Sequence, residues 1–160
     1  MYLSSCLEQL KAQTMTAEPF ARRDWMGLIA RAPLTLLDAH WPDDAPAFTW
    51  LRAPEMGAMM VQGRAGAVGA AFNLGEVTVT RASVRLGCGT VGHALVQGRS
   101  PRKAERAALL DALLQTASGA ALQTRVLAPL QDAERHQSEG RARRAAATKV
   151  DFFTLVRGEA

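Results

Sequence analysis

The chain of 160 residues is poor in cysteine and in aromatic residues, and it lacks long apolar runs. It contains two cysteines, Cys6 and Cys88, and aromatic residues make up 6% of it. Two cysteines so far apart exclude a disulfide framework and favour free thiols in a reducing compartment. Nothing approaches the ~20 consecutive apolar residues of a membrane span, and the N-terminus has no basic leader followed by an apolar core. We therefore expect a cytoplasmic protein without a membrane partner.

Sequence patterns for catalysis and for metal binding are missing as well. The three histidines, His40, His93 and His136, lie far apart and have no second ligand at a useful spacing, whereas a metal site needs several converging ligands. No spacing of carboxylates singles out an acid–base pair, and no glycine motif for nucleotide phosphates is present. The sequence thus predicts no catalytic residue, no metal and no cofactor bound by this chain.

Positive charge is what the chain does have. Its formal net charge is +4 and its pI is about 9.7, mostly through arginine. Arginine suits planar contacts with carboxylates and phosphates. Because the basic residues are spread along the chain, the charge is compatible with anionic ligands or with nucleic acid and selects neither.

Local patterns predict helices at both ends of a β-rich middle. Helices are expected over Ala21–Ala32, Pro33–His40, a stretch opened by Ser100-Pro101 and capped by Gly119, Ala120–Leu127 and Gln131–Ala147. Short strands separated by proline and glycine are expected between them, over Phe48–Arg52, Gly57–Gln62, Ala70–Asn73, Glu76–Leu86 and Thr90–Gln97. Residues 1–20 are predicted to be a variable extension, and residues 21–160 a single domain.

The last eleven residues, from Val150 to Ala160, have the composition of a strand. Phe152 and Phe153 are adjacent and must point to opposite faces, so the segment is apolar on both. Such a strand lies inside a sheet or under a partner protein. The predicted fold is therefore α+β: a largely antiparallel sheet of about five to six strands, including the C-terminal one, with the N-terminal helices and those of the C-terminal half packed on it.

Two patterns single out arginines as candidates for contact with an anion. In Glu76–Leu86 the apolar phase changes around Thr80-Arg81, which requires a bulge; without one, Arg81 shares a face with Val77 and Val79. The tetrapeptide Val-Gln-Gly-Arg occurs twice, ending at Arg64 and at Arg99. A Gly-Arg pair after a strand can offer N–H groups and a guanidinium to an anion, or it can be an ordinary exit from the strand.

Seven segments, in this order, resemble the PhnG family, a small subunit of the bacterial carbon–phosphorus lyase system for phosphonate breakdown. They are Arg22-x-x-Trp25-Met26, Arg52-x-x-Glu55-x-Gly57, Thr78-Val79-Thr80-Arg81-Ala82-x-Val84-Arg85-Leu86, Val96-Gln97-Gly98-Arg99, Ala104-Glu105-Arg106-x-Ala108-Leu109-x-Asp111-Ala112-Leu113, Leu127-Ala128-Pro129-Leu130 and Val150-Asp151-Phe152-Phe153-Thr154-x-Val156-Arg157-Gly158. The resemblance covers about Arg22 to Gly158.

The resemblance implies an accessory subunit without activity of its own, in a complex with PhnH, PhnI and PhnJ. Its reaction would join a phosphonate to the ribose C1 of ATP, the co-substrate, and displace adenine. The subunit would cover a nucleosidase site on PhnI, exclude water and hold the phosphonate instead. Arg64, Arg81 and Arg99 are the candidates for substrate or anion contact, and Trp25, Phe152, Phe153 and Arg157 for the partner interface.

Two other classes of function remain open at this point. A small basic nucleic-acid-binding domain is the main alternative, although few aromatics are available for stacking on bases. A free-standing transferase would require activity from the purified chain alone.

Overall fold

The computed structural model describes residues 20–42, 46–66 and 68–150. The predicted C-terminal strand and nearly all of the predicted extension over residues 1–20 lie outside this part. The described elements run in the order α2 (Arg22–Arg31), α3 (Leu34–Ala39), β1 (Phe48–Arg64), β2 (Ala71–Leu86), β3 (Val91–Gln97), α4 (Pro101–Leu114), α5 (Gly119–Leu122), the π-helical turn η1 (Gln123–Leu127) and α6 (Ala128–Ala147).

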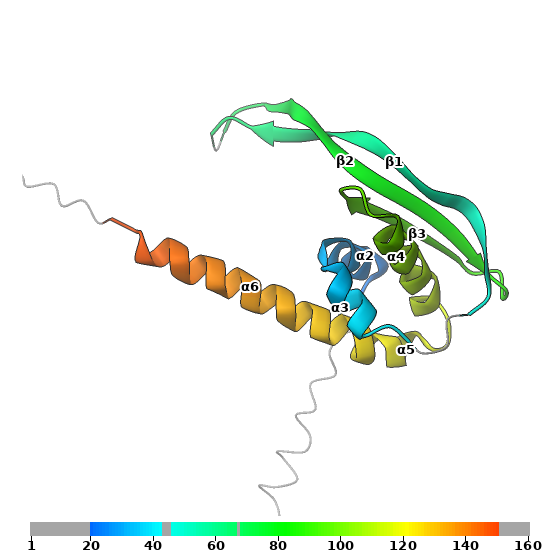
Figure 1. Cartoon of the computed structure of the whole chain (residues 1–160). Coiled ribbons are helices and arrows are strands. Elements are labelled where there is room, and N and C mark those ends of the chain that lie inside the picture. The colour runs from blue at the N-terminus through cyan, green and yellow to red at the C-terminus, as the bar shows by residue number, and fades with distance from the viewer. Residues whose placement is uncertain (1–19, 43–45, 67, 151–160) are drawn as a thin grey trace, which may run out of the picture.

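The fold is α+β, as predicted, with the helices on one side of an antiparallel sheet (Figure 1). The strand order is β1-β2-β3. We call the face covered by α4 the inner face and the opposite one the outer face. None of the helices in the described part of the chain combines the length and apolar composition needed to cross a membrane.

The predicted count of five to six strands is not confirmed, because the described sheet has three. The breaks expected at Pro54 and Gly75 do not occur. Pro54 lies in edge strand β1 at an irregular step between Arg52 and Glu55, a place where a missing N–H costs no ladder bond. Gly75 still pairs with Val61, and the register shifts only beyond it. Pro54 and Gly75, which had indicated breaks between short strands, therefore lie at or beside irregular steps within the long strands β1 and β2.

The bulge predicted near Thr80-Arg81 in β2 is wrong. The pairing of β2 with β3 runs without a shift from Val79 to Arg85, and the nearby irregular steps are carried by β1. Arg81 therefore shares the outer face with Val79, as expected without a bulge. Thr80 is fully buried on the inner face. Its hydroxyl donates to the carbonyl of Gly98 at 2.6 Å and accepts from the amide of Ser100 at 3.1 Å.

The helices of the C-terminal half exist, but two of their predicted ends are wrong. Gly119 begins α5 and does not cap α4, which already ends at Leu114. The chain does not leave the helix before Pro129, since η1 continues into α6. Pro129 lies in the first turn of α6, directly after the π-helical turn, where the proline lacks the N–H that a continuous helix would use. Beyond Leu130, α6 buries no residue, and it projects from the body of the fold (Figure 1).

One buried carboxylate joins α2, α4 and β3. Asp111 of α4 is 1% exposed. Its Oδ1 accepts hydrogen bonds from Arg22 Nε at 3.1 Å and Trp25 Nε1 at 2.9 Å. Its Oδ2 accepts from Arg22 Nη2 at 2.7 Å and from the backbone amide of His93 at 2.9 Å. All four donors thus converge on one side chain, which satisfies it without water.

Helix α4 lies against β3 at a glycine. A Cβ on Gly92 would come within 2.0 Å of the carbonyl oxygen of Ala108 and 2.6 Å of the amide nitrogen of Ala112. Both are backbone atoms, so the clash could be relieved only by moving the helix from the sheet. The alanines on this side of α4 are buried for the same reason.

We predict that Asp111→Asn destabilises the fold by about 2–4 kcal/mol, because an amide cannot accept from all four donors and leaves at least one of them unpaired. Glu134→Gln is the matched control, since Glu134 also accepts two bonds from one arginine, Arg31, but at an exposed site. It should cost less than about 1 kcal/mol. Urea unfolding of both variants measures the difference, and equal losses would contradict a central role for Asp111.

We also expect Gly92→Ala to destabilise the chain by about 1–3 kcal/mol or more through overpacking. Gly57→Ala is the control, because a Cβ there has nothing within 4 Å and alanine in a strand costs less backbone entropy than glycine. Thermal unfolding should show a lower midpoint for the first variant only. A midpoint unchanged by Gly92→Ala would mean that α4 does not lie so close to β3.

Candidate interaction surface on the sheet

The outer face of the sheet is left open by the helices, and its proximal half carries most of its charge. Arg52 and Glu55 on β1, Arg81, Ser83 and Arg85 on β2, and His93 on β3 share this face by strand register. Arg52 and Arg81 contact the carboxylate of Glu55, and Arg85 lies further along the same face. The sequence had indicated Arg81 alone; the alternation of residues 81, 83 and 85 was the signal that places Arg85 on the same face.

Glu55 sits between two of these arginines. Arg52 Nη1 donates to Glu55 Oε1 at 3.0 Å, and Arg81 Nε donates to the same oxygen at 2.5 Å. The hydrogen bond from Arg81, with the positive charge of both arginines, lowers the pKa of the Glu55 carboxyl. On the neighbouring strands, the hydroxyl of Ser83 lies 2.9 Å from Nδ1 of His93. The carboxylate of Glu55 therefore holds the guanidinium groups of Arg52 and Arg81 together at an exposed position.

The other two candidate arginines lie elsewhere. Arg64 ends β1 and donates to the carbonyl of Gly69 at 3.3 Å. It pairs with Ala71, which stands ten positions from Arg81 along β2, or about 33 Å at the rise of a strand. Arg99 is exposed, between β3 and α4. The structure does not bring the three arginines together.

The distal part of the sheet is a two-stranded projection that we call the arm, comprising residues 58–64 of β1, residues 71–78 of β2 and the loop between them. It extends past β3 and past the helices (Figure 1). A two-stranded ribbon is marginal in water without further packing. We therefore expect the stability of the arm to depend on a partner that packs against it.

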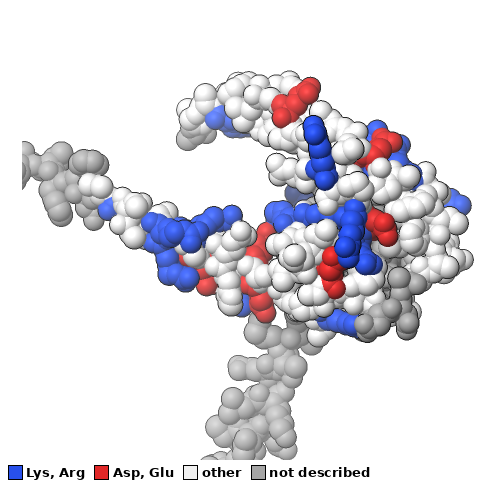
Figure 2. Space-filling model, in the orientation of Figure 1, with Lys and Arg blue, Asp and Glu red and all other residues white. Residues whose placement is uncertain are grey.

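Apolar side chains lie on both faces of the arm. Met59, Val61 and Val77 lie on the outer face and Met60, beside Glu76, on the inner one, as the strand register dictates. Met60 is 49% exposed and Leu74 is 62% exposed. Figure 2 shows few charged side chains on the visible side of the arm. Exposed apolar surface of this extent marks an interaction site.

The four residues predicted for the partner interface have different positions. Trp25 is 8% exposed, packs in the core and donates its indole N–H to Asp111, so its apolar ring is accounted for within the chain. Phe152, Phe153 and Arg157 lie outside the described residues. The exposed methionines of the arm were missed, because the sequence had been divided into shorter strands whose faces could not be aligned.

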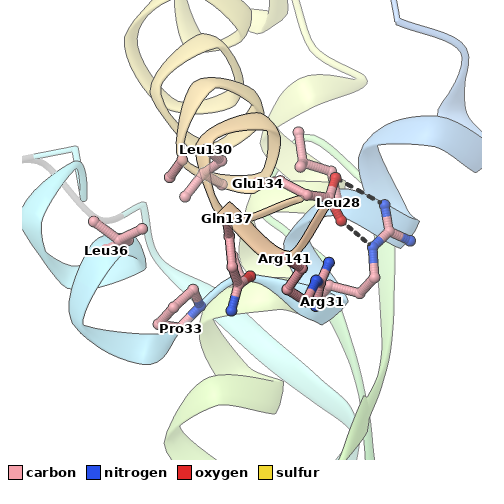
Figure 3. A pocket seen from close by; sticks show the side chains of 10 residues that line it. Leu28, Arg31, Pro33, Leu36, Leu130, Glu134, Gln137 and Arg141 are labelled. Carbon is pink, nitrogen blue, oxygen red and sulfur yellow. Dashed lines mark hydrogen bonds and ion pairs between the residues drawn. The ribbon is translucent and has the colours of Figure 1, made fainter. Parts of the chain in front are cut away.

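A hollow of about 370 Å³ lies between α2, α3 and α6 (Figure 3). Leu28, Pro33, Leu36 and Leu130 form its apolar wall, and Gln137 and Arg141 stand at its rim. Arg31 donates to both oxygens of Glu134, at 2.5 and 3.2 Å, and this bond lowers the pKa of the Glu134 carboxyl. The described residues place no three metal-ligating side chains together, here or elsewhere.

Two comparisons identify relatives of the chain. The family model described as phosphonate metabolism protein PhnG matches residues 20–158. A protein of Rhizobium meliloti (strain 1021), named alpha-D-ribose 1-methylphosphonate 5-triphosphate synthase subunit PhnG, is 46% identical over 144 residues, which cover 86% of this chain and 90% of the relative. The range matched by the family model spans Arg22, Trp25 and Asp111, which the fold brings together. The chain therefore belongs to the PhnG family of phosphonate metabolism proteins.

Proposed function

We propose that this chain is a non-catalytic accessory subunit of an alpha-D-ribose 1-methylphosphonate 5-triphosphate synthase and that it binds its partner through the outer face and the arm. The similarity to a named subunit of that synthase supports the assignment. The observation that carries the proposed mode of action is the arm, which exposes apolar side chains on both faces. Such a surface fits a subunit interface better than a substrate pocket.

The partners proposed from the family resemblance are PhnI, PhnH and PhnJ, in the cytoplasm. ATP is the co-substrate of the complex and is not bound by this chain alone. The arm would anchor the subunit, and the arginines beside it would then face the partner. Because the charged half and the apolar half share one continuous face, docking the second positions the first.

The chemical contribution we propose is to favour phosphonate over water at the ribose C1. A nucleosidase site open to solvent transfers the ribose to water. Covering the site excludes water, and guanidinium groups lower the electrostatic cost of placing a phosphonate beside a triphosphate. Arg81 is the first candidate because Arg52 and Arg85 stand on the same face. Arg64 and Arg99, predicted with it, lie apart from this cluster.

The nucleic-acid alternative is less well supported. Surfaces that bind a phosphodiester backbone are cationic along their length, whereas the projecting arm of this chain is apolar. Loss of binding to RNA or DNA with rising salt is the measurement that would revive it.

The first test removes the apolar character of the arm. We predict that Met59→Asp with Phe72→Asp prevents assembly with the co-expressed partner subunits, since buried carboxylates at an interface centre are strongly unfavourable. Both side chains are about half exposed, so the chain itself should stay folded. Met59→Leu with Phe72→Leu is the matched control and should assemble normally. Co-purification measures assembly, and normal assembly of the Asp variant would exclude the arm as the anchor.

The second test separates docking from chemistry. With ATP and methylphosphonate, the complex containing Arg81→Ala should assemble but shift product from ribose phosphonate to free ribose triphosphate, by about tenfold if one charge-assisted contact to the phosphonate is lost. Arg64→Ala, at the far end of the arm, should leave the ratio unchanged, and Arg99→Ala tests the remaining candidate. If assembly and product ratio are both unaffected by Arg81→Ala, Arg81 has no role in the reaction.

A further inference from the structure

Helix α6 continues far beyond the part of it that packs on the fold. Leu130 is its last buried residue, and every residue from Arg141 to Val150 is exposed. The ion pairs that α6 forms through Asp132 and Glu134 lie near its start. A helix that is polar on all sides needs many side-chain pairs along its length or bridges to another molecule. The projecting end of α6 fits the second case.

The charge of α6 changes sign along the helix. Its acidic residues end at Glu139, and Arg141, Arg143 and Arg144 follow. Figure 2 shows basic side chains gathered over the projecting end of the helix. In the described part of the chain, neither Arg143 nor Arg144 makes an ion pair. The last turn suits a cation and contains Arg144. Arg141 and Arg143 lie before that turn, so the helix dipole does not account for all three.

One side of α6 combines apolar and cationic groups. Leu130, Gln137 and Arg141 line the hollow between α2, α3 and α6. Arg144 stands three positions after Arg141 and therefore continues the same side, whereas Arg143 points to the other side. We call the side formed by Leu130, Gln137, Arg141 and Arg144 the docking face. It is about 21 Å long, from the rise of 14 helical residues.

The hollow gives the docking face an apolar end. Leu28, Pro33 and Leu36 complete its wall together with Leu130 (Figure 3). Its volume of about 370 Å³ leaves room for an apolar side chain of another molecule. Apolar anchors that fill such a depression contribute most of the binding energy in many protein interfaces.

The rest of the docking face has excess positive charge. Arg31 donates to both oxygens of Glu134, at 2.5 and 3.2 Å. This bond and, after it, the charges of Arg31 and Arg141 lower the pKa of the Glu134 carboxyl. One carboxylate thus stands with three arginines, Arg31, Arg141 and Arg144, along this side of the helix. A molecule that brings carboxylates to Arg141 and Arg144 compensates the excess.

The length and the lining of the docking face favour a protein segment as its occupant. A small molecule seated in the hollow does not extend to Arg144. A nucleic acid would bring phosphates but no apolar group for the hollow. None of the described residues that line the hollow is aromatic, so a base would have no ring to stack on. An amphipathic segment with acidic side chains supplies both the apolar group and the negative charge.

We propose that the docking face binds an acidic amphipathic segment of another subunit of the synthase, with an apolar side chain in the hollow and carboxylates on Arg141 and Arg144. This contact lies on the helical side of the fold and is additional to the outer face and the arm. The arm and α6 project from the body in the same direction (Figure 1), so one partner can contact both. The surface follows from the structure, and the choice of a synthase subunit as the partner rests on the proposed function.

The test is a competition for assembly. The partner subunits are co-expressed with an excess of wild-type and variant chain together, and mass spectrometry measures the ratio of the two in the purified complex. Arg144→Glu should be excluded by at least about tenfold, because an attractive charge pair becomes repulsive. Arg143→Glu is the matched control, with the same change of charge on the other side of the helix. It should be excluded by less than about threefold, since solvent screens it from the contact.

A second pair of variants tests the apolar end. Ala133 lines the hollow, so Ala133→Trp should fill it, displace the apolar side chain of the partner and be excluded by at least about tenfold. Ala146→Trp adds the same side chain to the other side of α6, where the chain is exposed, and should compete as well as the wild type. Circular dichroism should show equal helical content in all four variants.

The outcomes separate this contact from the proposed function. If the wild-type chain does not enter the complex, the proposed function fails and the partner named here fails with it. If the wild type assembles but Arg144→Glu and Ala133→Trp compete equally well, the docking face alone is wrong. Equal exclusion of Arg143→Glu and Arg144→Glu would mean attraction without a defined face and overturns the proposal. If Arg144→Glu leaves assembly unchanged but abolishes binding of a single-stranded RNA, the face serves nucleic acid and the proposal is also overturned.

Discussion

The carboxylate of Asp111 fixes how the helices meet the sheet. It accepts from a side chain at the start of α2, from the indole of Trp25 one turn later and from the backbone of β3. Since a buried carboxylate is costly without all its partners, these contacts require α2 and α4 to lie on the same face of the sheet as each other. Gly92 allows α4 to approach closely enough for the bond to His93 to form. The outer face remains open as a result.

A sheet face that no helix covers is stable in water if it is charged or if a partner molecule covers it. In the proximal half of this face the charge is sufficient, since the charged side chains of Arg52, Glu55 and Arg81 are readily solvated by water. In the arm it is not, because methionine, valine and phenylalanine are exposed on a ribbon of two strands. In the proposed function, the apolar half of this face supplies the binding energy, and the charged half gains its position from that binding.

The sequence predicted the type of fold and most helices, but not the lengths of the strands. The helix expected over Ala21–Ala32 is present, and Trp25, Leu28 and Ile29, which share one side of it by helical spacing, are buried. The strands were broken at Pro54 and Gly75, because these residues usually end strands in isolation. Whether they do depends on the neighbouring strand, and the register shifts that accommodate them are tertiary features. For the same reason the meeting of Arg22, Trp25 and Asp111, which are far apart in the chain, was not predictable from local patterns.

The candidate site shows the same limit in another form. A single arginine out of phase with its strand was detected at residue 81, but the meaning of that position came from its neighbours across the strands. Glu55 and Arg52 reach it only because β1 carries extra residues opposite residues 81–84. Had β1 been regular, Arg52 and Glu55, three positions apart, would have pointed to opposite faces, and the carboxylate would not have stood between two guanidinium groups. The irregular steps of β1, one of which contains Pro54, therefore determine the electrostatics of this face.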